Sequence, residues 1–325
     1  MAKPHVWVTR SRDGGILDVE VELMASVNVA LDHPLSKVVG VARGVLHRHV
    51  RARYGKPAVR RGTDWPAGLV ATDVSLPGPG GSTLRGWFCR PEENAARSEG
   101  NAVRPAGAVV VHGWGGSAAD LVPIARPLLD VGVHTLLLDA RCHGRSDDAE
   151  FTSMPRFAED VAAGVRWLRD QPHLDPERIL LVGHSVGAGA CLLVARDDPR
   201  IAAVVSLSSM ADPREMMTRL LTGSHLPKPF IRLALRLVEH LIGLRFSEFA
   251  PLTTLPTLAV PVLLVHGEHD AVVPAADARR LASAAPDATL LVVPGAGHAH
   301  LDDATLVSDA LREFALRTVA ASANR

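Results

Sequence analysis

The sequence contains few of the residues that indicate a disulfide-bonded or metal-bound protein. Its 325 residues include three cysteines, Cys89, Cys142 and Cys191, which are widely separated and odd in number. No CxxC pair and no cysteine–histidine spacing suggests a metal site or a disulfide framework. We therefore expect a reducing, cytoplasmic compartment.

Lysine is also scarce, and the net charge is zero. The 35 lysines and arginines, only four of them lysine, are balanced by 35 aspartates and glutamates. No basic excess is available to attract nucleic acid or an anionic membrane. Residues 1–12 contain no apolar core of signal-peptide length, and no run of about 18 uncharged apolar residues occurs. We expect no nucleic-acid partner and no stable membrane insertion.

The sequence does contain short apolar runs that alternate with segments of helical length. These runs are rich in Val, Leu and Ile and cover residues 108–111, 135–138, 179–182, 201–207, 262–265 and 289–293. Continuous apolar runs are typical of parallel strands buried on both faces. Their alternation with helices predicts right-handed crossovers and a doubly wound α/β sheet.

Three further segments complete the predicted architecture. Residues 69–76 and 83–88 flank a turn-rich stretch of Pro, Gly and Ser, which predicts an antiparallel hairpin at the N-terminal edge of the sheet. Residues 210–258 contain helical patterns between two predicted strands, so a helical cap is expected there. The core then comprises residues 66–209 and 259–325. Residues 1–65 form a helical extension, whose basic helix is compatible with packing on the core, a homodimer contact or a membrane surface.

The most informative motif is Gly183-His184-Ser185-Val186-Gly187. It lies between the apolar run 179–182 and a helical segment that starts near residue 186. A serine at a sharp strand-to-helix turn needs small neighbours, because larger side chains would collide with the strand and the helix. Such a turn lifts the Ser185 hydroxyl above the sheet, at the positive end of the following helix. The motif therefore predicts a nucleophilic serine.

The order of several motifs resembles the α/β-hydrolase superfamily over about residues 68–320. The matching segments are His112-Gly113-Trp114-Gly115-Gly116, Asp139-Ala140-Arg141-Cys142-His143-Gly144, the Ser185 motif, His266-Gly267-Glu268-His269-Asp270 and Gly295-Ala296-Gly297-His298. The pattern is most similar to esterases and peptidases of the prolyl-oligopeptidase and dienelactone-hydrolase kind. Cys142 is a departure, because many members carry glycine there. The resemblance implies an α/β-hydrolase fold.

A serine nucleophile needs a base and an acid that orients the base. His298, in a glycine-rich loop after the last predicted strand, is the expected base, and His300 is its rival. Asp270 follows the run 262–265 and is the expected acid. Asp212 is the alternative acid, and Glu268 can be structural.

The oxyanion formed during acyl transfer needs N–H donors that are already in place. The residue after the nucleophile, Val186, should supply one backbone amide. By family resemblance, Trp114 should supply the other, and its indole can also form a wall of the substrate pocket. Apolar residues of the predicted cap, with Met217 and Leu237 as the candidates for substrate binding, suggest a lipophilic, uncharged substrate.

We therefore expect a serine hydrolase that cleaves small-molecule carboxylic esters through an acyl-enzyme intermediate and requires no cofactor. A peptidase or aminopeptidase, a lipase and an acyltransferase would share the same triad. A ligand-binding or scaffold protein on a hydrolase fold is the alternative from a different class, since fold does not fix function.

Overall fold

The structure, a computed structural model, describes residues 55–57, 68–92, 104–222, 228–285, 287–298 and 305–322. In these residues one eight-stranded sheet has the strand order β1-β2-β4-β3-β5-β6-β7-β8. The strands are β1 (Val70–Pro77), β2 (Thr83–Arg90), β3 (Gly107–Val111), β4 (His134–Asp139), β5 (Ile179–His184), β6 (Ile201–Leu207), β7 (Val262–Gly267) and β8 (Thr289–Val293). The predicted extension over residues 1–65 lies outside the described residues, apart from Gly55, Lys56 and Pro57.

The sheet is mostly parallel, as predicted. β2 pairs antiparallel with both β1 and β4, so the β1–β2 hairpin forms one edge. The pairs from β4 to β8 are all parallel. Every residue of β3, β6 and β7 is buried, which accounts for their continuous apolar sequences. β8, at the other edge, is only partly buried.

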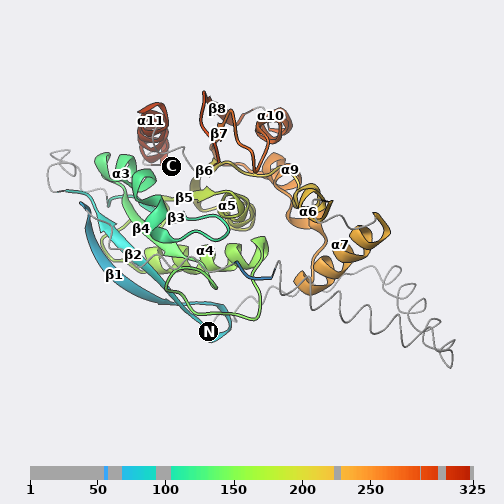
Figure 1. Cartoon of the computed structure of the whole chain (residues 1–325). Helices are drawn as coiled ribbons and strands as arrows, with labels where there is room; N and C mark the ends of the chain where they lie inside the picture. The colour runs from blue at the N-terminus through green and yellow to red at the C-terminus, as the bar shows by residue number, and fades with distance from the viewer. Residues whose placement is uncertain are drawn as a thin grey trace. The chain divides into compact units, whose positions relative to one another are not determined.

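Helices cover both faces of this sheet. α3 (Val122–Asp130) and α11 (Thr305–Ser322) pack together on one face, and α4 (Met154–Arg169) and α5 (Val186–Asp197) pack together on the other (Figure 1). Ser153 caps the N-terminus of α4: its hydroxyl accepts a hydrogen bond from the Arg156 amide, and Pro155 lies in the first turn of the helix. The two layers of helices confirm the doubly wound arrangement.

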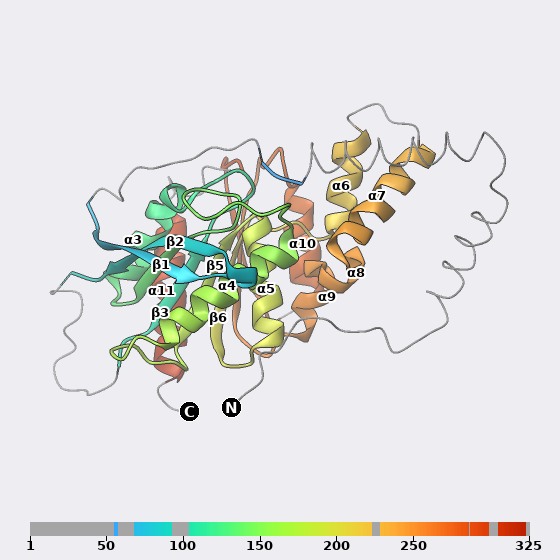
Figure 2. The same cartoon turned by 90° about the horizontal axis from the view of Figure 1, so that it is seen from below.

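The helical segment predicted between two strands is present between β6 and β7. It comprises α6 (Pro213–Thr222), α7 (Lys228–Ile242), α8 (Phe246–Phe249), α9 (Pro251–Thr254) and a 3-10 turn, η3 (Leu255–Thr257). Figure 2 shows α6 to α9 grouped together next to α10 (Ala275–Ala284). In α7 the buried residues, Ile231, Ala234, Leu235 and Leu237, alternate with exposed arginines in helical spacing. The boundaries of a separate cap domain stay a prediction.

None of the described helices is both long enough and apolar enough to cross a membrane.

Buried histidines lie close to the carboxyl ends of the strands. Burial lowers the pKa of His112 to about 4 and that of His143 to about 3. The two rings are 4.8 Å apart, centroid to centroid, so protonation of one also opposes protonation of the other. Both are therefore neutral at pH 7.

The neutral histidines predict a loss of stability in acid. An unfolded histidine titrates near pH 6.5, so between about pH 6.5 and pH 4 the unfolded chain binds more protons than the folded one. The free energy of unfolding should therefore fall with decreasing pH, by up to ~1.4 kcal/mol per pH unit for each such histidine. Urea unfolding at pH 7.0, 5.5 and 4.5 measures this slope. The variant His143→Phe should show a shallower slope, and equal midpoints for the wild type at pH 7.0 and 4.5 would contradict the prediction.

Candidate active site

Ser185 occupies the turn between β5 and α5. Its backbone has φ 54° and ψ −117°, a left-handed conformation that is costly for a residue with a side chain. The Ser185 amide donates a hydrogen bond of 2.8 Å to the Leu207 carbonyl of β6, and its own carbonyl accepts from the Ala188 amide at 3.1 Å. These bonds hold the strained turn in place at the start of α5.

The two glycines of the motif are required by close backbone approach. A Cβ added to Gly183 would lie 2.3 Å from the carbonyl oxygen of Gly187. A Cβ added to Gly187 would lie 2.4 Å from the His112 carbonyl oxygen, in the loop that follows β3. Both distances are shorter than real Cβ contacts allow, so β5, α5 and the His112 loop meet here only because these positions lack side chains.

His298 is hydrogen-bonded to Asp270. Nδ1 of His298 lies 2.7 Å from Oδ2 of Asp270, and the Asp270 side chain is fully buried. Oδ1 of the same carboxylate accepts hydrogen bonds from the amides of Val272 at 2.9 Å and Val273 at 2.8 Å. The residues predicted as base and acid therefore form a pair, although they are 28 positions apart in the chain.

The environment of Asp270 favours its ionised form. Burial alone raises the pKa of this carboxyl group. Hydrogen bonds from the side chains of His266 and His298 and from the Val273 amide outweigh burial and lower the pKa well below its usual range. An ionised Asp270 can stabilise a protonated His298 beside it.

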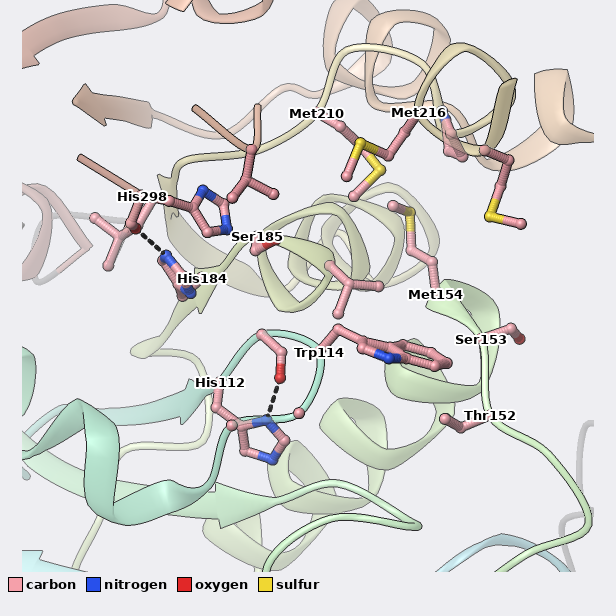
Figure 3. A pocket seen from close by; sticks show the side chains of 18 of the residues that line it. His112, Trp114, Thr152, Ser153, Met154, His184, Ser185, Met210, Met216 and His298 are labelled. Carbon is pink, nitrogen blue, oxygen red and sulfur yellow. Dashed lines mark hydrogen bonds between the residues drawn. The ribbon is translucent and has the colours of Figure 1, made fainter. Parts of the chain in front are cut away.

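Ser185 and His298 line the same cavity. Figure 3 shows the His298 ring with one nitrogen directed toward the Ser185 side chain, while the Asp270 bond occupies the other nitrogen. The structure thus brings together the three residues predicted as nucleophile, base and acid. This arrangement can accept a proton from the serine hydroxyl and return it to a leaving group.

The two residues predicted to supply the oxyanion amides both line this cavity. Val186 is the first residue of α5, and Trp114 lies in the loop after β3. Among the hydrogen bonds of the described residues, neither backbone amide serves as a donor. A Cβ on the neighbouring Gly113 would lie 3.0 Å from the Ser185 Cβ, so this loop lies directly against the serine.

His112 fixes the path of the Trp114 loop. Its Nδ1–H donates to the Gly113 carbonyl at 2.7 Å, and its Nε2 accepts from the Ala140 amide at 3.1 Å. Since the carbonyl can only accept and the amide can only donate, both bonds define one neutral tautomer. The ring therefore ties the loop after β3 to the end of β4.

The cavity has a volume of about 910 Å³ and a mainly apolar wall. Four of the six methionines of the chain line it: Met154, Met210, Met216 and Met217. In Figure 3 the side chains of Met210 and Met216 and the Trp114 indole lie around the same open space beside Ser185. Trp114 is 43 % exposed, as expected of a residue at a pocket wall.

The predicted substrate-binding residues differ in their placement. Met217 lines the cavity, whereas Leu237 is not among its lining residues. Leu237 is 4 % exposed and packs in the interior, and the residues of α7 that do line the cavity are Val238, Leu241 and Ile242. The amphipathic pattern identified the buried side of α7 but not which part of it faces the pocket.

Two of the other candidate residues, Asp212 and Glu268, make contacts away from the His298–Asp270 pair. Asp212 accepts the Arg214 amide at 2.7 Å and caps α6. Glu268 accepts the Gly295 amide at 3.2 Å and so braces the loop that carries His298. His300 lies outside the described residues. Among those residues, no group of three or more histidine, cysteine or acidic side chains is arranged to hold a metal ion.

Sequence reasoning missed the wall formed by residues 151–154. Phe151, Thr152, Ser153 and Met154 line the cavity at the start of α4. Their position in the sequence could have indicated this, because the long loop after β4 must cross the carboxyl edge of the sheet before α4 begins.

A sequence model described as the alpha/beta hydrolase family matches residues 108–310. The chain belongs to the alpha/beta hydrolase family, and the structure has the α/β-hydrolase fold. An uncharacterized protein of Mycobacterium tuberculosis H37Rv is 29% identical over 256 residues, which cover 78% of this chain and 81% of that protein.

Two solved structures show the same fold. An esterase of Pyrococcus furiosus has a TM-score of 0.61 at 20% identity, covering 81% of this chain and 100% of the other. A puromycin-hydrolyzing peptidase of M. tuberculosis has a TM-score of 0.60 at 22% identity, covering 77% of this chain and 39% of the other. At these identities both likenesses show the fold alone.

The close contact at Gly187 gives a testable prediction about stability. Gly187→Ala forces a Cβ against two backbone carbonyls, those of His112 at 2.4 Å and Val111 at 2.9 Å. We expect the free energy of unfolding to fall by about 3 kcal/mol or more, since backbone cannot yield as a flexible side chain does. Gly297→Ala is the control, because no atom lies within 4 Å of its added Cβ. Urea unfolding compares the two; a Gly187→Ala protein as stable as the control would contradict this packing.

Proposed function

We propose that the chain is a serine hydrolase that cleaves carboxylic esters with a lipophilic, uncharged acyl or alcohol group. The observation that carries the proposal is the His298–Asp270 hydrogen bond of 2.7 Å beside the cavity that Ser185 lines. In this arrangement Asp270 would orient His298, and His298 would act as the base for Ser185, as acyl transfer requires.

In the proposed mechanism, His298 takes the proton of the Ser185 hydroxyl as its oxygen attacks the ester carbonyl. Asp270 holds the imidazole by its Nδ1–H and stabilises the imidazolium that forms. The amides of Val186 and Trp114 receive the developing oxyanion. His298 gives the proton to the departing alcohol, and a water molecule then cleaves the acyl-enzyme by the same steps. The residues present need no metal or organic cofactor for this sequence.

The cavity wall supports esters over peptides with a free amino terminus. An aminopeptidase would need a carboxylate available for the substrate's ammonium group. Asp120 is the one acidic residue among the described lining residues, and one of its oxygens, Oδ2, accepts the Ser117 amide at 2.9 Å as a capping contact. The rest of the wall is mainly apolar, which favours lipophilic groups.

Reaction with a fluorophosphonate probe tests the nucleophile. The probe forms a covalent bond with an activated serine, so intact-protein mass spectrometry should show one adduct, located at Ser185 by peptide mapping. Ser185→Ala should abolish the adduct. Ser283→Ala, at an exposed position of α10, should keep it. A folded wild-type protein without an adduct would reject the proposal.

The chain-length preference tests the substrate class. A panel of p-nitrophenyl esters of increasing acyl length should show a rate maximum at medium or long chains, and Met217→Ala should change kcat/KM for the preferred ester about tenfold. Leu316→Ala, an exposed position on α11, is the control. An aminoacyl anilide cleaved faster than every ester would overturn the esterase assignment. A length profile that Met217→Ala leaves unchanged would remove Met217 from the pocket.

A further inference from the structure

His184 precedes the serine and contacts the loop that carries the predicted base. Its Nε2 lies 2.8 Å from the backbone carbonyl oxygen of His298, the bond drawn in Figure 3. The two rings lie 4.8 Å apart, centroid to centroid, with 51° between their planes. His184, the residue next to Ser185, is thus hydrogen-bonded to the backbone of His298, the residue that should deprotonate Ser185.

This hydrogen bond defines the tautomer of His184. A carbonyl oxygen can only accept, so Nε2 must carry the proton. Burial, followed by the nearby charge of His298, lowers the pKa of His184 to about 4. The nearby ionisable groups are His298, Asp270 and His266, and the carboxylate does not offset burial. At pH 7 His184 is therefore neutral, with its proton on Nε2 and none on Nδ1.

The opposite side of the ring faces the loop after β3. A Cβ added to Gly113 would lie 3.0 Å from Nδ1 of His184 and 3.0 Å from the Ser185 Cβ. The His184 ring therefore lies between the loop of the base and the loop of the predicted oxyanion amide. Neither loop can move toward the other unless this ring moves.

On the basis of the proposed function, we propose that His184 is a positioning residue. Its Nε2–H bond to the His298 carbonyl holds the base over Ser185, while the Asp270 bond sets the orientation of the imidazole. The Asp270 bond alone would fix the His298 ring but not the position of its backbone. The His184 bond alone would fix the backbone but not the orientation of the ring. The two bonds together fix the distance across which the serine proton moves.

The neutrality of His184 matters to this role. During the reaction His298 becomes an imidazolium, and a second positive ring at 4.8 Å would oppose that charge. A residue in this position must donate a hydrogen bond without carrying a charge. A neutral imidazole or a side-chain amide meets both requirements.

Two variants of nearly equal shape test the donor. In His184→Gln the side-chain amide can reach the His298 carbonyl, whereas His184→Met has similar length and no donor. We expect His184→Met to lower kcat for the preferred ester about 10- to 100-fold with KM within about twofold, because misplacement of the base affects the transition state alone. His184→Gln should recover kcat to within about fivefold of wild type. Circular dichroism and urea unfolding establish that both variants fold.

The outcomes separate this inference from the proposed function. Wild-type protein that reacts with the fluorophosphonate at Ser185, together with a slow Met variant and a recovered Gln variant, supports the positioning role. Labelled wild type with Met and Gln variants that are equally active, or equally impaired, overturns it while leaving the triad intact. Wild type that is inert to the probe defeats the proposed function and this role with it.

A second measurement does not depend on activity. In ¹⁵N-labelled protein, the NMR signals of His184 should show Nε2 protonated and Nδ1 unprotonated from pH 8 down to about pH 5. A proton on Nδ1 in place of Nε2 overturns the inferred hydrogen bond. A ring fully protonated above pH 6 overturns the neutrality that the positioning role requires.

Discussion

The close approach of three backbone segments around Ser185 governs the candidate site. β5, the first turn of α5 and the loop after β3 come within contact distance at Gly183 and Gly187, where a single added carbon would collide with a carbonyl oxygen. This approach forces Ser185 into a left-handed conformation at the helix start. The hydroxyl, the Val186 amide and the loop of Trp114 are thereby assembled by one packing constraint.

Histidines at or near the ends of three strands form further hydrogen bonds to the loops around the site. His112, after β3, His184, at the end of β5, and His266, in β7, each have a ring nitrogen bonded to a backbone carbonyl. The bonds of His184 and His266 attach the loops that carry His298 and Asp270, and His112 attaches the Trp114 loop to the end of β4 through the bond that it accepts from the Ala140 amide. A buried imidazole can satisfy a carbonyl in the interior without carrying charge. The sheet and these contacts together define where each of these loops lies.

The fold was predictable because its signals are local or periodic. Continuous apolar runs identified buried parallel strands, and the glycine spacing around Ser185 identified the turn. Predicting that His298 pairs with Asp270 also required the order of the motifs along the chain. The sequence could not show which residues of α7 line the cavity. Leu237 and Val238 are adjacent in one amphipathic helix, and only tertiary packing decides which of them faces the cavity. The role of His184 was also hidden, since its partner is a backbone carbonyl 114 positions away.

The methionine side chains of the cavity bear on how it discriminates between ligands. Thioether chains are unbranched and have several rotatable bonds, so a wall built from Met154, Met210, Met216 and Met217 takes its contour from whatever fills it. Such a lining favours the binding of apolar groups but discriminates little between ligands of different shape. If the proposed function holds, selectivity would depend mainly on the bond that reacts at Ser185, where the close packing at Gly183 and Gly187 permits little adjustment, and less on the rest of the substrate.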